Sequence, residues 1–237
     1  MLIAIPLYES NGTYRINKAY LDYIECAGYV PVPIYQTESE NTLNLINKCD
    51  GLLLPGGTDI EPTFYGMDNV TSICPDLKRD NFERFLYYHF KEQNKPILGI
   101  CRGFQLIFLE EGLNEPNLRF YQHIKGHNQM DKHRLVDRDL PTHNVIYSKL
   151  LYNDKANPEL DSITFVNSMH HQGVKVIKNK KMKFKKIIPL AFHKDVLEAF
   201  MVKGTNIFAV QWHPEELKDV NLLWRIFKEA GKKEVSR

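Results

Sequence analysis

A cysteine stands between two glycines at a point where a reactive thiol is favoured. Cys101 lies between Gly99 and Gly103, where the short apolar run 96–100 gives way to apolar residues at helical spacing. The two periodicities predict a strand that ends at the cysteine and a helix that begins after it. Glycines permit a tight turn there, and the positive end of the helix favours a thiolate. The pattern indicates a nucleophile, with a structural cysteine in a tight turn as the alternative.

A histidine and a glutamate near the C-terminus have the spacing of a base and the acid that orients it. The stretch NIFAVQWHPEE places His213 and Glu215 after a β-type run, and Pro214 keeps them out of a continuing helix. A thiol nucleophile needs a base, and the base needs a group that holds its orientation. We expect the Glu215 carboxylate to reach the ring nitrogen of His213 that does not face the thiol. A surface turn with a solvated histidine is the alternative.

A glycine pair directly follows another predicted strand. Pro55, Gly56 and Gly57 come after the apolar run GLLL, so flexible backbone with free N–H groups lies at the end of that strand. Together with the N–H of Arg102, this turn is placed to supply two donors to a developing oxyanion, each commonly worth roughly 3 kcal/mol of barrier. A plain turn remains the alternative.

The elements that must position these residues alternate along the first half of the chain. Strands and helices in alternation predict a mainly parallel central sheet with helices on both faces, and the sites of such sheets lie beyond the carboxyl ends of the strands. The second half predicts a smaller antiparallel excursion and a closing amphipathic helix. The expected strands are 2–7, 30–34, 51–55, 96–100, 143–148, 162–168, 185–192, 196–202 and 206–212, and the expected helices are 16–28, 42–50, 79–95, the segment after 101, and 218–233. No linker is visible, so we expect a single three-layer α/β domain over residues 1–237.

The composition argues against several classes of partner. The 237 residues are 43% hydrophobic and 25% charged, with a formal net charge of +2, which is ordinary for a globular protein with a sizeable core. So small a charge gives no general reason to expect nucleic acid or a membrane as partner. Four cysteines without a CxxC pair fit a reducing compartment, and neither a signal peptide nor a membrane-spanning run is visible. We therefore expect a cytoplasmic protein.

Five ordered motifs resemble those of one family. The stretches LLLPGGTDIEPTFYG, RDNFE, PILGICRGFQ, VNSMHHQGV and VQWHPE are similar, in order and in approximate separation, to the class I glutamine amidotransferase superfamily. Within it they most resemble the branch of γ-glutamyl-γ-aminobutyrate hydrolases. The resemblance runs from the first strand to the last helix, and it implies a flavodoxin-like domain of the class I glutamine amidotransferase type.

The resemblance implies a role for each residue singled out above. Cys101 corresponds to the nucleophile, His213 to the base and then the acid, and Glu215 to the orienting carboxylate. The backbone amides of Gly57 and Arg102 correspond to the oxyanion hole. The positions that correspond to substrate binding are Gly56, Gln105, Asn167, Ser168, His170, His171 and Gln172.

The reaction that the resemblance implies is hydrolysis of a γ-glutamyl amide through a γ-glutamyl thioester, which releases glutamate and an amine. It requires no metal and no organic cofactor, and its partner is a small-molecule γ-glutamyl substrate, with a homodimer left open. The segment NSMHHQ favours a hydrolase, because ordinary amidotransferases usually carry a different segment there. Two alternatives remain: a glutaminase subunit that supplies ammonia to a separate synthase, and a non-catalytic binding protein of the same fold.

Four histidines in the polar stretch of the second half have spacings that fit no familiar set of metal ligands. They are His123, His127, His133 and His143. We interpret them as solvated loop histidines. Asp195 and Glu198 correspond to a family hairpin near the amine side of the substrate, and both contact with substrate and a plain exposed hairpin remain open.

Two segments depart from the family pattern or stand outside it. The segment from Glu110 to Phe120, EEGLNEPNLRF, replaces the glycine pair and small hydroxyl residue that such hydrolases usually have, which leaves the pocket wall and the leaving amine undetermined. Six lysines lie between Lys178 and Lys186. We interpret this run as a solvated loop or edge strand, where lysine blocks unwanted pairing, with a landing site for an acidic or phosphorylated substrate as the alternative.

Overall fold

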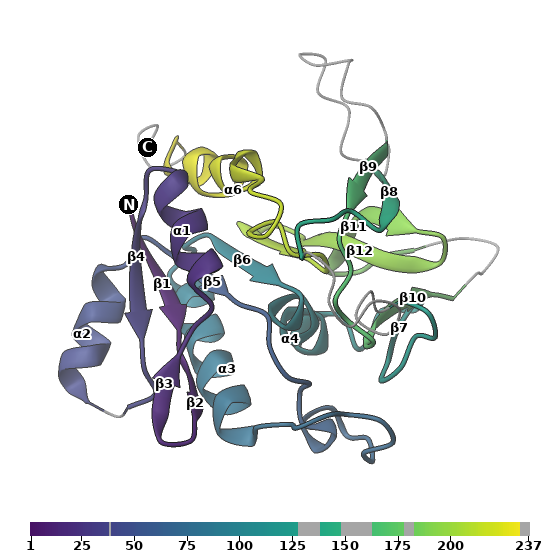
Figure 1. The fold of residues 1–237 in the computed structure, drawn as a ribbon, viewed down its shortest axis with the longest axis horizontal. Coiled ribbons are helices and arrows are strands. Elements are labelled where there is room, and N and C mark those ends of the chain that lie inside the picture. Colours follow the sequence, from purple (N-terminus) through teal and green to yellow (C-terminus); the bar gives the residue numbers. More distant parts are fainter. Residues whose placement is uncertain (38, 128–137, 148–162, 178–182, 233–237) are drawn as a thin grey trace.

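Five parallel strands form the part of the sheet that carries the predicted site. They pair in the order β4-β1-β5-β6-β13 in a computed structural model that describes all residues except 38, 128–137, 148–162, 178–182 and 233–237 (Figure 1). The bounds are β1 Leu2–Pro6, β4 Val30–Ile34, β5 Gly51–Leu54, β6 Ile97–Ile100 and β13 Ile207–Val210. The predicted parallel sheet is confirmed.

Helices cover both faces of these strands, so the predicted three layers are present. Side chains alternate along β1: Ile3 and Ile5 pack on the face covered by α1 and α6, while Ala4 faces α2, α3 and α4. This is the period of two that a strand buried on both faces requires. The helices are α1 Lys18–Cys26, α2 Glu40–Lys48, α3 Leu77–Glu92, α4 Arg102–Glu111 and α6 Val220–Lys232. Within the described part of the chain, no helix is long and apolar enough to cross a membrane.

The antiparallel part is larger than the sequence indicated. Beyond β13 the sheet continues through β12, β11, β8 and β9, and β10 pairs with both β12 and β7. These six strands outnumber the five parallel ones among the described residues. Their bounds are β7 Leu118–Tyr121, β8 His143–Tyr147, β9 Ile163–Val166, β10 Gly173–Val176, β11 Ile187–His193 and β12 Val196–Val202.

Five short elements were not predicted. They are the hairpin of β2 (Tyr8–Ser10) and β3 (Thr13–Arg15), the 3₁₀ helix η1 (Pro62–Tyr65), and strands β7 and β10. Each spans only three or four residues, which is too short for a hydrophobic period to stand out from its surroundings.

The departing segment Glu110–Phe120 stabilises the fold. Glu111 accepts a hydrogen bond from Tyr87 Oη at 2.8 Å and pairs with Lys91. Glu115 is buried and accepts from the backbone N–H of Ile187 at 3.0 Å, at the start of β11. The acidic residues of this segment therefore tie the end of α4 to the antiparallel part of the sheet.

Candidate active site

Cys101 occupies a strained turn between β6 and α4. Its backbone has φ 51° and ψ −96°, a left-handed conformation that is uncommon for a residue with a side chain. Gly103 makes the turn possible, because a Cβ there would lie 2.3 Å from the carbonyl oxygen of Leu54. The predicted strand-to-helix junction is confirmed, with the cysteine at the N-terminus of the helix.

His213 and Glu215 lie beyond β13, the strand next to β6, and form the expected pair. His213 Nδ1 and Glu215 Oε1 are 2.6 Å apart, and both residues are buried. Burial by itself lowers the pKa of the His213 imidazole, but the acidic groups of Glu215 and Cys101, which both hydrogen-bond to the ring, raise that pKa to about 10. The histidine is therefore protonated at neutral pH and lies between the thiol and the carboxylate.

The glycine turn after β5 closes over the same point. A Cβ on Gly56 would lie 2.9 Å from His213 Cε1 and 3.5 Å from Cys101 Cβ, so the turn packs directly against both side chains. Arg102 is the first residue of α4, and its N–H has no acceptor within the helix. The carboxyl ends of β5, β6 and β13 thus bring together the three motifs that the sequence singled out.

An arginine orients the peptide between Gly56 and Gly57. Arg79 Nη2 donates to the carbonyl of Gly56 at 2.8 Å. Because the C=O and N–H of a trans peptide point in opposite directions, this bond turns the Gly57 N–H away from Arg79. A Cβ on Gly57 would lie 2.1 Å from Arg79 Nη1, so any other residue there would displace the guanidinium.

A buried charge network holds Arg79 and the nucleophile turn together. Glu83 accepts from Arg79 Nε at 2.6 Å and also binds the guanidinium of Arg102, which is paired with Asp80 as well. Burial is the main influence on both Asp80, whose pKa it raises, and Arg102, whose pKa it lowers. The sequence motif RDNFE marked Arg79, Asp80 and Glu83, but the sequence analysis gave these three residues no role.

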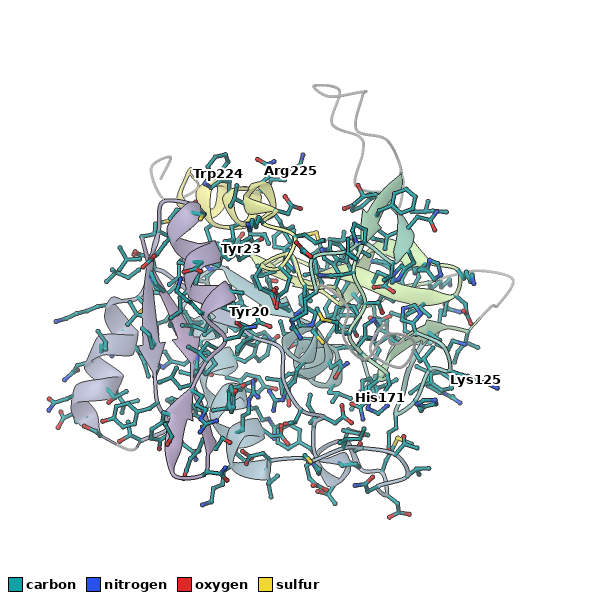
Figure 2. All side chains as sticks on the ribbon, in the orientation of Figure 1. Tyr20, Tyr23, Lys125, His171, Trp224 and Arg225 are labelled. Carbon is teal, nitrogen blue, oxygen red and sulfur yellow. The ribbon has the colours of Figure 1, made fainter. Side chains whose placement is uncertain are left out.

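Tyr20 is a residue of the site that sequence reasoning missed. Its hydroxyl accepts from the Gly56 N–H at 2.9 Å and lies 3.4 Å from His213 Nδ1. Burial, and then the charge of Glu215, raise the pKa of Tyr20 well above its ordinary value, so the phenol stays protonated. Tyr20 and Tyr23 both lie on α1 (Figure 2). The sequence predicts that a tyrosine on the apolar face of an amphipathic helix belongs to the hydrophobic core. Nothing in the sequence distinguishes Tyr20, which lies in the site, from Tyr23.

Asn167 positions the base. Its Oδ1 accepts from the N–H of His213 at 2.9 Å, and its Nδ2 donates to the carbonyl of His213 at 3.2 Å. A fully buried amide that binds both backbone groups of one residue fixes that residue's place. The structure therefore uses Asn167 to hold the base, whereas the resemblance implied a substrate contact.

The other residues of NSMHHQ bind protein groups. His170 Nδ1 lies 2.7 Å from the carbonyl of Gln172, and burial lowers the pKa of His170 to about 3. His171 Nε2 pairs with Asp59 at 2.8 Å, on the side of the molecule that holds β7 and β10 (Figure 2). Ser168 Oγ donates to the carbonyl of His127. Gln172 Nε2 donates to Ser72 Oγ at 2.8 Å.

Gln105 lies one turn beyond the nucleophile, as expected, and is buried. Its Nε2 donates to the carbonyl of Gln172 at 3.2 Å and approaches Gln211 Oε1 at 3.5 Å. It links the nucleophile helix to NSMHHQ and to the residue that follows β13.

A cleft of about 450 Å³ reaches the site from the side of the β2–β3 hairpin. Among the predicted substrate-binding residues, only Gly56 lines it, together with Gly57 and His213. Its other lining residues are Tyr8, Glu9, Ser10, Ile16, Asn17, Tyr20, Thr58, Cys74, Asp76, Arg79 and Arg138. The hairpin was not predicted, so the part of this wall formed by Tyr8, Glu9 and Ser10 could not be read from the sequence.

The described part of the lysine run and the family hairpin lie outside the cleft wall. Residues 178–182 of the run are not among the described residues, and none of Lys183, Lys185 and Lys186 lines the cleft. Asp195 pairs with Lys175 at 2.9 Å, and Glu198 is fully buried. The described lysines give no support to a phosphate landing site.

Comparison with known proteins decides the family. The Peptidase C26 model matches residues 6–215, most of the chain. The chain belongs to the Peptidase C26 family. Its class I glutamine amidotransferase-like character agrees with the resemblance seen in the motifs. One C26 relative, the provisionally named glutamine amidotransferase-like protein YvdE of Lactococcus lactis, is 30% identical over 214 residues, which cover 89% of this chain and 84% of the relative.

A second relative of this C26 protein has a defined activity in its name. The γ-glutamyl-γ-aminobutyrate hydrolase PuuD of Escherichia coli K12 is 27% identical over 227 residues, which cover 94% of this chain and 87% of that protein. Family and relatives together support a hydrolase.

Solved structures agree on the fold of the C26 chain. A glutamine amidotransferase from Thermotoga maritima superposes with a TM-score of 0.55 at 13% identity, covering 99% of this chain and 85% of that one. PurLQS from the same organism gives a TM-score of 0.57 at 14% identity, covering 96% and 97%. At these identities the likeness concerns architecture only, and it confirms the predicted fold class.

Proposed function

We propose that this protein is a cysteine-dependent hydrolase that cleaves γ-glutamyl amide bonds and releases glutamate and an amine. The observation that carries the proposal is the convergence of Cys101, His213 and Glu215 at the ends of adjacent parallel strands, with His213 between thiol and carboxylate. The PuuD relative supports γ-glutamyl amides as the substrate class.

The proposed reaction begins with attack of Cys101 Sγ on the side-chain carbonyl carbon of the γ-glutamyl group. A protonated His213 stabilises negative charge on the sulfur that it faces, and it then gives its proton to the leaving amine. The N–H groups of Gly57 and Arg102 stabilise the oxyanion. Water, deprotonated by His213, then attacks the thioester, which releases glutamate and restores the thiol.

Glu215 and Tyr20 support the base in this scheme. The carboxylate fixes the His213 ring and stabilises its protonated form, as the acid of a catalytic triad does. Tyr20 ties the Gly56 peptide to the same ring. The interactions of Glu215 and Tyr20 hold the base and the glycine turn at a fixed relative position while the substrate's carbonyl carbon changes from planar to tetrahedral.

The test is glutamate release from a panel of purified compounds: glutamine, γ-glutamyl-γ-aminobutyrate, γ-glutamyl-putrescine and a γ-glutamyl conjugate of a phosphorylated amine. Cys101→Ala is the inactive control, and Cys26→Ala is the matched control, because Cys26 is an exposed thiol on α1. We expect Cys101-dependent release from at least one conjugate, faster than from glutamine.

Two outcomes would overturn the proposal. Activity on glutamine alone, rising when a synthase is added, would favour a glutaminase subunit. No release from any compound, although Cys101 is demonstrably alkylated by iodoacetamide, would favour a binding protein of this fold.

A further inference from the structure

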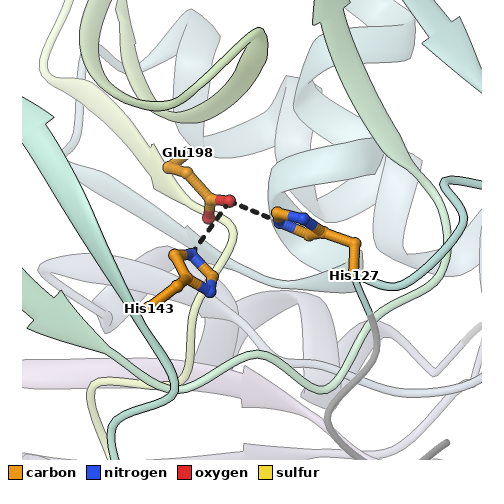
Figure 3. Close-up of side chains that lie close together, drawn as sticks. All are labelled: His127, His143 and Glu198. Carbon is orange, nitrogen blue, oxygen red and sulfur yellow. Dashed lines mark hydrogen bonds and ion pairs between the residues drawn. The ribbon is translucent and has the colours of Figure 1, made fainter.

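A second cluster of chemically capable side chains lies in the antiparallel part of the sheet. Glu198, on β12, is fully buried, and two histidines from distant segments reach its carboxylate (Figure 3). His127 Nε2 lies 2.7 Å from Glu198 Oε1, and His143 Nε2 lies 3.3 Å from the same oxygen. Sequence spacing led us to interpret His127 and His143 as solvated, but their side chains are only 9% and 12% exposed.

Hydrogen bonds within the protein leave this cluster incomplete. Among the described residues, Glu198 Oε2 and His143 Nε2 are buried and have no hydrogen-bond partner. Buried polar atoms are almost always hydrogen-bonded, so the free oxygen Glu198 Oε2, beside an imidazole nitrogen whose contact with Glu198 Oε1 is only a 3.3 Å ion pair, indicates a missing ligand.

Two further imidazoles surround the carboxylate and have the orientation of metal-site histidines. The ring of His170 lies 4.7 Å from that of His127, and the ring of His193 lies 4.3 Å from that of His143. In each, Nδ1 lies 2.7 Å from a backbone carbonyl oxygen. A hydrogen bond at Nδ1 fixes the tautomer and leaves a lone pair on Nε2, which is the arrangement found behind metal-binding histidines. The Nε2 atom of His170 is buried and has no hydrogen-bond partner.

We propose that His127, His143 and Glu198 bind one divalent transition-metal ion of the zinc class. One ligand atom from each residue lies within 4.8 Å of the others. A tetrahedral ion with bonds of about 2.0–2.2 Å holds its ligand atoms about 3.3–3.6 Å apart, so a small side-chain movement that separates His127 Nε2 from Glu198 Oε1, now 2.7 Å apart, would admit the ion. Nitrogen and oxygen ligands of this kind suit Zn²⁺ better than Mg²⁺ or Ca²⁺, which prefer oxygen alone. His170 and His193 are the imidazoles whose rings lie nearest to those of His127 and His143.

The ion would stabilise the segment that carries the base. Glu198 accepts, through its backbone carbonyl, from the N–H of Gln211 at 2.7 Å, two residues before His213. Ser168 donates to the carbonyl of His127. An ion at the cluster therefore ties the loop of His127, strand β8 and strand β12 to the segment that carries the base, without taking part in the reaction.

The experiment is a cobalt titration of the full-length protein after treatment with a chelator. Tetrahedral Co²⁺ has intense visible absorption bands and reports coordination directly, and Zn²⁺ should displace it. The titration is carried out in the Cys101→Ala chain, because a thiol facing His213 is itself a metal-binding pair. Glu198→Gln and His127→Gln remove a ligand, and His89→Gln is the matched control, because His89 lies on α3 and binds Asn47.

All variants carry Cys101→Ala. We expect one tetrahedral Co²⁺ per chain, displaced by Zn²⁺, both in Cys101→Ala alone and when His89→Gln is added. Glu198→Gln and His127→Gln should weaken binding at least about 100-fold, because loss of a residue that only supports a ligand already costs roughly 10–100-fold. Equal binding by the Glu198→Gln chain, or only the weak bands of octahedral cobalt, would overturn the proposal.

A second measurement keeps the proposal testable if those variants do not fold. Zn²⁺ should raise the Tm of the Cys101→Ala chain, by an amount that grows with the logarithm of its affinity, and leave the Tm unchanged when His143→Gln is added, since a ligand that binds only the folded state stabilises it. An unchanged Tm in the Cys101→Ala chain, together with no cobalt bands, would count against a metal site.

Discussion

The candidate triad and the cluster around Glu198 are assembled in opposite ways. Cys101 and His213 each follow a parallel strand within a few residues, so strand neighbours decide where they lie. His127 and His143 come from a loop and from a strand in the antiparallel part, and they meet Glu198 across gaps of 71 and 55 positions. One site is fixed by local motifs, and the other exists only once the antiparallel strands have paired.

We therefore expect substitutions in the triad to affect mainly activity and substitutions in the Glu198 cluster to affect mainly stability. Removing the thiol of Cys101 should abolish chemistry and spare the fold, because the residue lies at a turn. Removing Glu198 should damage the fold first, because it is the shared partner of the imidazoles around it. The predictions that follow test this contrast.

Cys101→Ala should lower the rate of glutamate release by at least about 1,000-fold, since the nucleophile is lost. Its free energy of unfolding should change by less than about 1 kcal/mol, because alanine tolerates the positive φ at this position as well as cysteine does. Steady-state kinetics and urea unfolding measure both. Retained activity would remove Cys101 from the mechanism.

Glu198→Ala should destabilise the chelator-treated protein by about 3 kcal/mol, the cost of leaving buried polar partners without their common acceptor. Glu25→Ala is the control, because Glu25 is exposed on α1 and should cost less than about 0.5 kcal/mol. Urea unfolding of both variants, side by side, gives the comparison. Similar costs for the two would show that the cluster contributes little to the fold.

Gly103→Ala should destabilise the protein by about 2 kcal/mol, because the new Cβ would lie 2.3 Å from the Leu54 carbonyl and the core must shift. Gly12→Ala is the control: a Cβ there meets nothing within 4 Å, although its φ is +70°. Thermal unfolding should show the larger loss of Tm at Gly103. The reverse order would contradict tight packing of the nucleophile turn against β5.

Much of the parallel half could be predicted from the sequence, because its strands are continuous apolar runs and its glycines mark the turns. The Cys101 turn, the His213–Glu215 pair and the glycine turn of Gly56 were predicted for the same reason: each lies within a few residues of a strand end. Parallel strands carry such residues to one edge of the sheet.

The features of the two sites that could not be predicted are contacts between segments far apart in the sequence. Tyr20 resembles an ordinary core residue of a helix until the fold places its hydroxyl beside Gly56. Asn167 was expected to face substrate, and it also binds the backbone of His213, because the segments that follow β9 and β13 meet only in the folded chain. His127 and His143 were interpreted as solvated, because spacing along the chain carries no information about a shared carboxylate 55 or 71 positions away.

The His213 ion pair should make stability depend on pH. Its pKa is about 10 in the folded chain and near 6.5 in the unfolded one, so its stabilising contribution is complete below pH 6.5 and is lost as the pH rises toward 10. The difference in unfolding free energy between the wild type and His213→Gln should shrink over that range, by up to about 1.4 kcal/mol per pH unit. A difference independent of pH would contradict a protonated His213.

Tyr20→Phe should have the smallest effect, lowering kcat by up to about tenfold, since it removes one hydrogen bond worth about 1 kcal/mol. The substrate affinity should be nearly unchanged, because the hydroxyl contacts the Gly56 N–H and the base. Tyr23→Phe is the matched control: it lies on the same helix and loses a bond of 2.7 Å to the carbonyl of Asp219. Kinetics and unfolding of both variants distinguish a role in positioning the base from a role in packing.

If Tyr20→Phe and Tyr23→Phe lose the same small amount of stability and only Tyr20→Phe lowers kcat, the hydroxyl of Tyr20 positions the base. Equal kcat in the two variants would assign both tyrosines to packing and would leave Glu215 and Asn167 to orient His213.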